Sequence, residues 1–245
     1  MSPHTVTDAA SPSTERVVAV ALRQFAQEGF EDSKIETISH ESGMSKRMIH
    51  YHFGDKKGLY IEALKLAIAQ LRPEPQDMEL DSTVPVDGVR KVVEVIYDRI
   101  TSHPDAVRLM VLENLFDWGK MAHSAPLADQ SVVLLQMDKL LMMGQDAGAF
   151  RPGISAVDVY SIITSLCFQR TVYGATLSNL YAIDLTDQAN SEGNLHLVVD
   201  TVLAFLTSNL SARDPMSYLK QRSDSNETGA SSAIYDDVSA PGEFL

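Results

Sequence analysis

Cationic and protonatable side chains gather in the stretch SKRMIHYHFGDKK, residues 45–57. They are Lys46, Arg47, His50, His52, Lys56 and Lys57. The whole chain has 20 Lys and Arg against 33 Asp and Glu, a formal net charge of −13. A positive surface in so acidic a chain must be specified locally by the sequence. Because arginine pairs with guanine and lysine binds phosphates, the stretch predicts a contact with DNA.

Two short helices are expected to position these side chains. Ser33, followed by Glu36 three residues later, has the capping-box pattern and starts a helix that Gly43 ends. Ser45 then caps a helix over residues 46–52. Two short helices joined by Gly-Met-Ser predict a helix-turn-helix, whose second helix enters the major groove of DNA.

A longer helix is expected on each side of this pair. The first runs from about Ser13 to Glu28, where Gly29 suits a left-handed cap. The other runs over residues 55–71 and ends before Pro73.

A pattern of small, aromatic and basic residues runs through these helices. It comprises Ala21, Phe25, Ala26, Gly29, Phe30, Ile38, Gly43, Met44, Ser45, Lys46, Tyr51, His52, Phe53, Lys56 and Leu59. In this register, residues 13–66 resemble the N-terminal domain of the TetR (tetracycline-repressor) family of bacterial regulators. The resemblance implies an all-α fold, with an N-terminal three-helix helix-turn-helix DNA-binding domain and a C-terminal helical ligand-binding and dimerisation domain.

The resemblance also implies roles for individual side chains. The expected base readers are Lys46, Arg47, Met48 and His50. The expected phosphate contacts are Ser33, Ser45, Tyr51, His52 and Lys56. Arg47 stands where the family often has a small residue, and His50 where it usually has tyrosine, so no relative's operator sequence can be transferred to this chain.

The chain divides into four expected segments. Residues 1–12 are a predicted disordered arm, and residues 13–71 form the DNA-binding domain with its linking helix. Residues 72–210 form the helical regulatory and dimerisation domain, and residues 211–245 a predicted disordered tail. The stretch 72–87, rich in proline and acid, marks the boundary between the two domains.

The second domain reads as a series of helices without strand alternation. One helix is expected to start at Asp87 and the next at Pro104. Three more are expected over Pro126 to Gly148, Ser155 to Ser178, and Asn194 to Asn209.

The helices over 155–178 and 194–209 are apolar over more than one stripe, which indicates cover on two sides. A fully internal position in a monomer would produce the same pattern. In the TetR family the last two large helices form a four-helix dimer interface. The resemblance therefore implies a homodimer through these two helices, which would present two reading helices to a palindromic operator.

Methionine and aromatic side chains among polar groups in the middle helices suit a pocket for a small, largely apolar or aromatic effector. The candidates are Trp118, Arg170, Tyr173, Tyr97, Met121, Met142 and Phe168. Ordinary core packing is the alternative for each. Arg170 is the most informative, because a guanidinium on an apolar helix needs a partner.

Other chemistries find little support in the sequence. Cys167 is the only cysteine, which excludes an internal disulfide and a Cys-based zinc site, and we expect a buried thiol. His50 and His52 point in different directions on a helix, and neither a phosphate loop nor a dinucleotide fingerprint is present. We expect no cofactor, no metal site and no enzymatic activity. Without an apolar run near about 20 residues, we expect a cytoplasmic protein rather than a membrane protein.

The sequence therefore predicts a ligand-responsive DNA-binding regulator, most simply a repressor that a small effector releases from DNA. One alternative is an effector-independent regulator controlled by a protein partner, for which a filled or sealed regulatory core would be diagnostic. The other is a helical enzyme that resembles the family at its N-terminus alone.

Overall fold

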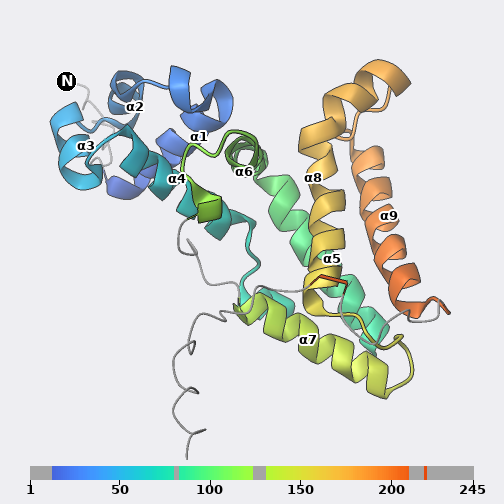
Figure 1. The fold of residues 1–245 in the computed structure, drawn as a ribbon. Coiled ribbons are helices and arrows are strands. Elements are labelled where there is room, and N and C mark those ends of the chain that lie inside the picture. Colours follow the sequence, from blue (N-terminus) through green and yellow to red (C-terminus); the bar gives the residue numbers. More distant parts are fainter. Residues whose placement is uncertain (1–12, 80–82, 124–130, 210–217, 220–245) are drawn as a thin grey trace, which may run out of the picture.

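The part of the chain that the structure describes is all-α (Figure 1). The structure is a computed structural model, and it describes residues 13–79, 83–123, 131–209 and 218–219. Nine α-helices and two short 3-10 helices occur in these ranges, and no strand does. The predicted fold class is confirmed.

Four helices form the N-terminal unit, which we call the reading unit. They are α1 (Thr14–Asp32), α2 (Ile35–Ser42), α3 (Lys46–Phe53) and α4 (Lys56–Leu71). Each turns an apolar stripe inward, and Phe25, Ile38, Ile49 and Leu59 meet in its core. The two short helices follow one another as the helix-turn-helix prediction requires.

The turn between α2 and α3 uses the residues that the sequence indicated. Gly43 has a φ of 78°, and its N–H donates to the carbonyl oxygen of Ser39 at 3.1 Å. A side chain at this φ would be strained, so glycine ends α2 here. The Ser45 hydroxyl then accepts the N–H of Met48 at 3.3 Å and starts α3.

Ser33, in contrast, does not cap α2, and the predicted capping box is wrong. Ser33 is buried, and its hydroxyl donates to the carbonyl oxygens of Gly29 at 2.6 Å and Gln24 at 3.2 Å. The Ser33 hydroxyl thus bonds to carbonyl oxygens of α1 and is not used to cap α2. Helix α2 begins without a side-chain cap.

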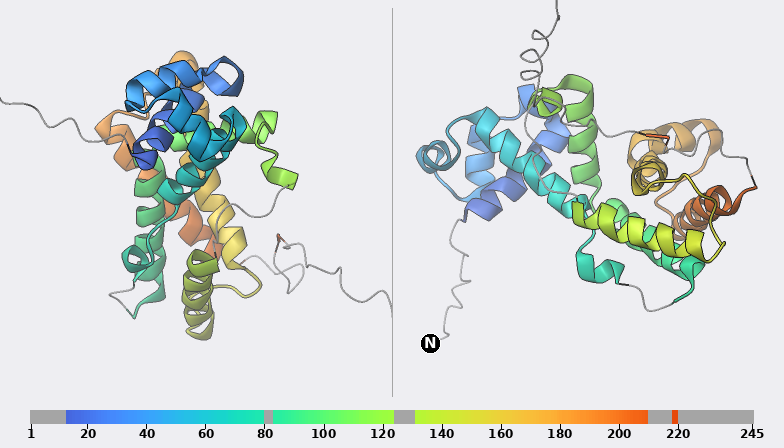
Figure 2. Two further views of the ribbon diagram at one scale, coloured as in Figure 1. Left: turned by 90° about the vertical axis from the view of Figure 1, so that its left-hand side faces the viewer. Right: turned by 60° about the horizontal axis from the view of Figure 1, so that its bottom comes forward.

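The remaining helices form the body. They are η1 (Pro75–Met78), α5 (Pro85–Ser102), α6 (Pro104–Phe116), η2 (Met121–His123), α7 (Ser131–Asp146), α8 (Ala156–Tyr181) and α9 (Gln188–Thr207). Helices α8 and α9 lie side by side, on the side of the molecule away from α3 (Figure 1). The left view of Figure 2 shows α7 at the end of the molecule opposite to α1 and α2.

The starts of α6 and α8 are as predicted, at Pro104 and at a capping box of Ser155 with Asp158. Helix α5 begins at Pro85 rather than at Asp87, because proline suits the first helical position. Helix α9 begins at Gln188 rather than at Asn194, in a polar turn that apolar periodicity cannot detect. The predicted start of α7, Pro126, lies outside the described residues.

The predicted arm, residues 1–12, also lies outside the described residues, as does the predicted tail 211–245 except for two residues. These two residues are Tyr218 and Leu219, whose N–H groups donate to the carboxyl oxygens of Asp158 at 3.2 and 2.8 Å. Within the described ranges, no helix is long and apolar enough to cross a membrane.

One apolar core continues from the reading unit into the body. Both α1 and α4 pack against α6, and Met78 in the predicted boundary is buried in the same core. The boundary near residue 72 therefore remains a proposal about function, because the core crosses it.

A buried carboxyl group lies where the reading unit meets the body. Glu113 of α6 accepts hydrogen bonds from the Tyr60 hydroxyl of α4 at 3.1 Å and from the N–H groups of Gly119 at 2.9 Å and Met121 at 3.0 Å. Burial, together with the nearby Glu113 carboxyl, raises the pKa of Tyr60, so its hydroxyl remains a donor. We call this set of contacts the Glu113 junction.

The loop that supplies these N–H groups is backbone-strained. Asp117 and Lys120 have φ values of 52° and 58°, which non-glycine residues rarely adopt. Between them, Trp118 stacks on Phe116 with ring centroids 4.7 Å apart. The Trp118 ring also packs against Gly29 near the end of α1. A Cβ atom added to Gly29 would lie 3.3 Å from this ring.

Replacing Glu113 tests this junction. Glu113→Ala should lower the free energy of unfolding by about 2–4 kcal/mol, because it leaves two buried donors and one half-buried donor without an acceptor and opens a cavity. Glu94→Ala, the same change at an exposed position of α5, should change it by less than about 0.5 kcal/mol. Urea unfolding followed by circular dichroism measures both. Equal losses would show that the hydrogen bonds to Glu113 do not hold the junction.

Candidate nucleic-acid interface

Helix α3 turns one side chain inward and most of the others to solvent. Ile49 is buried, whereas Lys46, Arg47, Met48, His50 and Tyr51 are exposed. All four predicted base readers thus lie on the exposed part of one helix. The side chains that could enter a groove of DNA are accessible, and their contacts with bases remain a prediction.

Lys46 is already paired in the absence of DNA. Its ammonium donates to the Glu36 carboxylate of α2 at 2.9 Å, and both side chains are more than half exposed. The hydrogen bond from Lys46, with a backbone hydrogen bond and the charge of Lys46, lowers the pKa of Glu36. Exposed ion pairs contribute little to stability, so a phosphate or a base could displace this carboxylate at small cost.

His50 is oriented by the end of its own helix. Its Nδ1 lies 2.9 Å from the carbonyl oxygen of Gly54. Gly54 has a φ of 76° and ends α3. One ring nitrogen of His50 is therefore engaged with the protein, and the ring is held along the exposed side of α3.

Tyr51 and His52 lie next on the helix and are both exposed. Their rings pack edge to face, with centroids 5.2 Å apart. Their position beside the base readers suits phosphate contacts, which remain predictions.

Lys56 is engaged with the reading unit. Its ammonium donates to the carbonyl oxygen of Glu31 at 2.9 Å and lies 4.8 Å from the centre of the Phe30 ring. The carboxylate of Asp55 caps α4 by accepting the N–H of Gly58 at 2.7 Å. An anion at this helix start would therefore compete with Asp55, which sequence reasoning did not foresee.

The two serines among the predicted phosphate contacts differ in accessibility. Ser45 is exposed at the start of α3. The buried hydroxyl of Ser33 points back to α1, and this argues against the phosphate contact predicted for its side chain.

Sequence reasoning missed the pairing of Glu36 and the anchoring of His50. Glu36 and Lys46 are ten residues apart on different helices, so helical spacing gave no signal for their contact. The anchor of His50 is four residues away but depends on the ring rotamer, which no sequence pattern specifies.

The predicted effector residues do not form one group. Tyr97 and Arg170 converge on Ser191, where the Tyr97 hydroxyl donates to its carbonyl oxygen at 2.9 Å and Arg170 donates to its hydroxyl at 3.1 Å. The partner that Arg170 required is thus a serine. Hydrogen bonds from Thr186, with a smaller effect of the Arg170 charge, lower the pKa of Asp184 nearby.

The other candidates lie elsewhere. Trp118 and Met121 belong to the loop of the Glu113 junction. Phe168 is half-buried against the core, whereas Met142 and Tyr173 are 58% and 43% exposed. Their effector role remains a prediction, and a single pocket shared by all seven is not what the described residues show.

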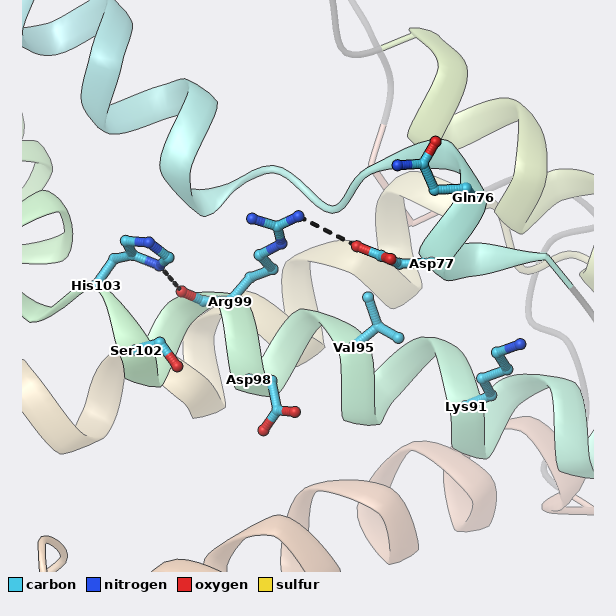
Figure 3. A pocket seen from close by; sticks show the side chains of 8 residues that line it. All are labelled: Gln76, Asp77, Lys91, Val95, Asp98, Arg99, Ser102 and His103. Atoms are coloured by element: carbon cyan, nitrogen blue, oxygen red, sulfur yellow. Dashed lines mark hydrogen bonds and ion pairs between the residues drawn. The ribbon is translucent and has the colours of Figure 1, made fainter.

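Two cavities of the body differ in character. One is an apolar cavity of about 10 Å³ between α5, α7 and α8, lined by Val89, Val92, Val93, Met137, Leu140, Leu141, Val159 and Ile163. A groove of about 580 Å³ runs along α5 beneath η1 (Figure 3). In that groove Arg99 pairs with Asp77 at 3.1 Å, and His103 Nδ1 lies 2.7 Å from the Arg99 carbonyl oxygen. Neither cavity was predicted.

Cys167 is buried, as expected, and burial raises the pKa of its thiol to about 12. It is therefore a poor nucleophile in the folded protein. Among the residues that the structure describes, no group of three or more His, Cys, Asp or Glu could hold a metal ion.

In comparisons with known proteins, both parts of the chain match families of tetracycline-repressor-like regulators. Residues 17–63 match the family described as "Bacterial regulatory proteins, tetR family". Residues 85–202 match "Tetracyclin repressor-like, C-terminal domain".

Three relatives illustrate the similarity. The HTH-type transcriptional repressor NicS of Pseudomonas putida is 30% identical over 197 residues, which cover 79% of this chain and 92% of NicS. The HTH-type transcriptional regulator RutR of Escherichia coli O157:H7 is 23% identical, over 67% of this chain and 87% of RutR. Among solved structures, the transcriptional regulator FadR from Bacillus subtilis, in complex with stearoyl-CoA, has a TM-score of 0.54 at 15% identity, over 80% of this chain and 98% of FadR. All three are transcriptional regulators rather than enzymes.

The pairing of Lys46 with Glu36 leads to a prediction. Glu36→Gln should tighten binding to random-sequence double-stranded DNA several-fold, because it removes a carboxylate from the reading face and leaves Lys46 available for phosphates. Glu94→Gln, which removes the same charge from α5, is the matched control and should change binding little. Fluorescence anisotropy at about 100 mM salt measures both. If the two variants bind equally, the Glu36–Lys46 pair does not restrain DNA binding.

Proposed function

Because the chain belongs to the TetR family of bacterial regulatory proteins, we propose that it is a homodimeric transcriptional repressor. It binds a palindromic operator through α3 and is released by a small effector. Its place of action is the bacterial cytoplasm, where the operator lies. The observation that carries the proposal is the exposed, cationic surface of α3 in a chain of net charge −13.

Base reading falls to four side chains of this surface. Arg47 suits a guanine and Met48, 41% exposed, a thymine methyl group. Lys46 and His50 complete the set, while Ser45, Tyr51, His52 and Lys56 position the helix on phosphates. Lys46 and Lys56 then exchange protein partners for DNA.

Dimerisation through α8 and α9 is supported by apolar side chains that these helices and the following turn expose. They are Val172, Tyr173, Leu180, Tyr181, Ile183 and Leu197. Exposed apolar side chains of this kind suit a surface that a partner covers. A second copy packed here in two-fold symmetry would place two α3 helices toward one side of the dimer.

The effector is proposed as a small, largely apolar or aromatic molecule. That FadR, a regulator with this fold, was solved with stearoyl-CoA supports ligand binding by such a body. In one conformation of the dimer the reading units are displaced from their DNA-binding positions. An effector that binds this conformation more tightly lowers operator affinity by the difference between its binding free energies for the two conformations. The contacts of Glu113 with α4 offer a route from α6 to the reading unit.

A second candidate is favoured by the packing of the body. The apolar cavity between α5, α7 and α8 holds only about 10 Å³, too little for a small molecule, and this suits a regulator controlled by a protein partner. A screen of small apolar and aromatic molecules for release of operator DNA distinguishes the two. Release by any of them supports the effector, and its absence throughout the screen supports the partner.

The operator contact is tested by removing two base readers. The Arg47→Ala, His50→Ala double variant should bind a selected operator about 100-fold more weakly, because two base contacts are lost. Arg90→Ala, which removes an exposed arginine from α5, should leave affinity within about twofold. Wild-type affinity should also fall steeply as salt rises. Unchanged operator affinity of the double variant would overturn the assignment of α3.

Dimerisation is tested by two leucines of similar exposure on different helices. Leu197→Asp on α9, 58% exposed, should shift the protein towards monomers, since it buries a charge in the proposed interface. Leu135→Asp on α7, 65% exposed, should not. Sedimentation velocity measures the oligomeric state. Dissociation by Leu135→Asp and not by Leu197→Asp would place the interface on α7.

A further inference from the structure

We propose that His50 reads the exocyclic amino group of adenine or cytosine, beside a guanine that Arg47 reads. The inference rests on the proposed function and adds what that function leaves open, the base preference of the reading helix. It follows from the hydrogen bond that His50 already makes within the protein.

The contact with Gly54 determines which ring nitrogen of His50 carries the proton. A carbonyl oxygen only accepts, so His50 Nδ1, 2.9 Å from it, must be the donor. In neutral imidazole the other nitrogen then has a lone pair and no proton. Nε2 is therefore an acceptor without a proton, on an exposed residue.

The major groove offers few partners for such an acceptor. Adenine and cytosine present amino donors there, whereas guanine and thymine present only acceptors at the corresponding positions. A lone pair on Nε2 therefore attracts adenine or cytosine and repels guanine or thymine. A tyrosine at this position, as is usual in the resembled family, could donate its hydroxyl proton as well as accept one.

Arg47 provides the complementary half of this pattern. It is one turn from His50, so the two side chains share a face about 5–6 Å apart and can reach neighbouring base pairs. Within the described residues the Arg47 guanidinium makes no ion pair or hydrogen bond, unlike Lys46, which is held by Glu36. An unengaged guanidinium binds the two acceptors of guanine in a bidentate manner.

The two residues thus predict a guanine next to an adenine or cytosine in each half-site. Lys46 and Met48 add contacts at flanking positions, and neither has an acceptor suited to a base amino group. His50 is accordingly the side chain to which a preference for adenine or cytosine can be traced.

The test selects bound sequences from random duplex DNA at about pH 8, where imidazole is neutral. It uses the full-length wild type, His50→Ala, His50→Lys and His52→Ala. In the wild type, one position per half-site should prefer adenine or cytosine over guanine and thymine. His50→Ala should reduce that preference about 5- to 10-fold, and His50→Lys, which carries only donors, should transfer it to guanine. His52→Ala, a change of the same residue type nearby, should weaken all sites alike.

Each other outcome has a definite meaning. No salt-dependent DNA binding by the wild type overturns the proposed function together with this inference. Sequence-specific binding whose base preferences are the same in wild type, His50→Ala and His50→Lys overturns the inference alone. Thermal unfolding of the variants separates loss of fold from loss of reading, and His50 is exposed enough for all to fold.

Discussion

The arrangement of reading unit and body depends on a buried carboxyl group that must be satisfied. Glu113 has no access to water, so its oxygens need donors from the protein. These come from Tyr60 of α4 and from the loop that follows α6. Moving α6 relative to α4 would leave donors or oxygens unpaired, at about 1–3 kcal/mol for each group. The two parts therefore move together, or the junction opens.

The reading surface is less positive than its composition suggests. Lys46 is paired with Glu36, and Lys56 is bound to the carbonyl of Glu31. Under the proposed assignment, DNA binding would exchange the contacts of these two lysines and add new contacts for Arg47. Such an exchange lowers affinity for arbitrary DNA by a small amount for each lysine, since each phosphate contact replaces a weak interaction already made. It leaves more of the discrimination to the groups that read bases.

The sequence correctly predicted helix caps and turns that depend on contacts between residues close together in the chain. The Ser45 cap, the Gly43 turn and the capping box of Ser155 involve residues within a few positions, and all three are present. The role of Ser33 was predicted wrongly because carbonyl oxygens of α1 compete for its hydroxyl. The start of α9 was missed because it is polar and has no apolar periodicity. The family resemblance gave the fold and the exposed reading helix, but not the partners of their side chains.

The effector residues were least predictable, because composition does not say where side chains meet. Trp118 suited a ligand pocket by type, yet its ring packs between Phe116 and the end of α1. The cavity between α5, α7 and α8 holds only about 10 Å³, so an effector entering there must separate these helices. Helix α6 packs on α8 and carries Glu113, so that separation would reach the junction with α4. In such a protein, binding and the conformational change would be one event, and the effector's preference for the separated state would follow from the packing itself.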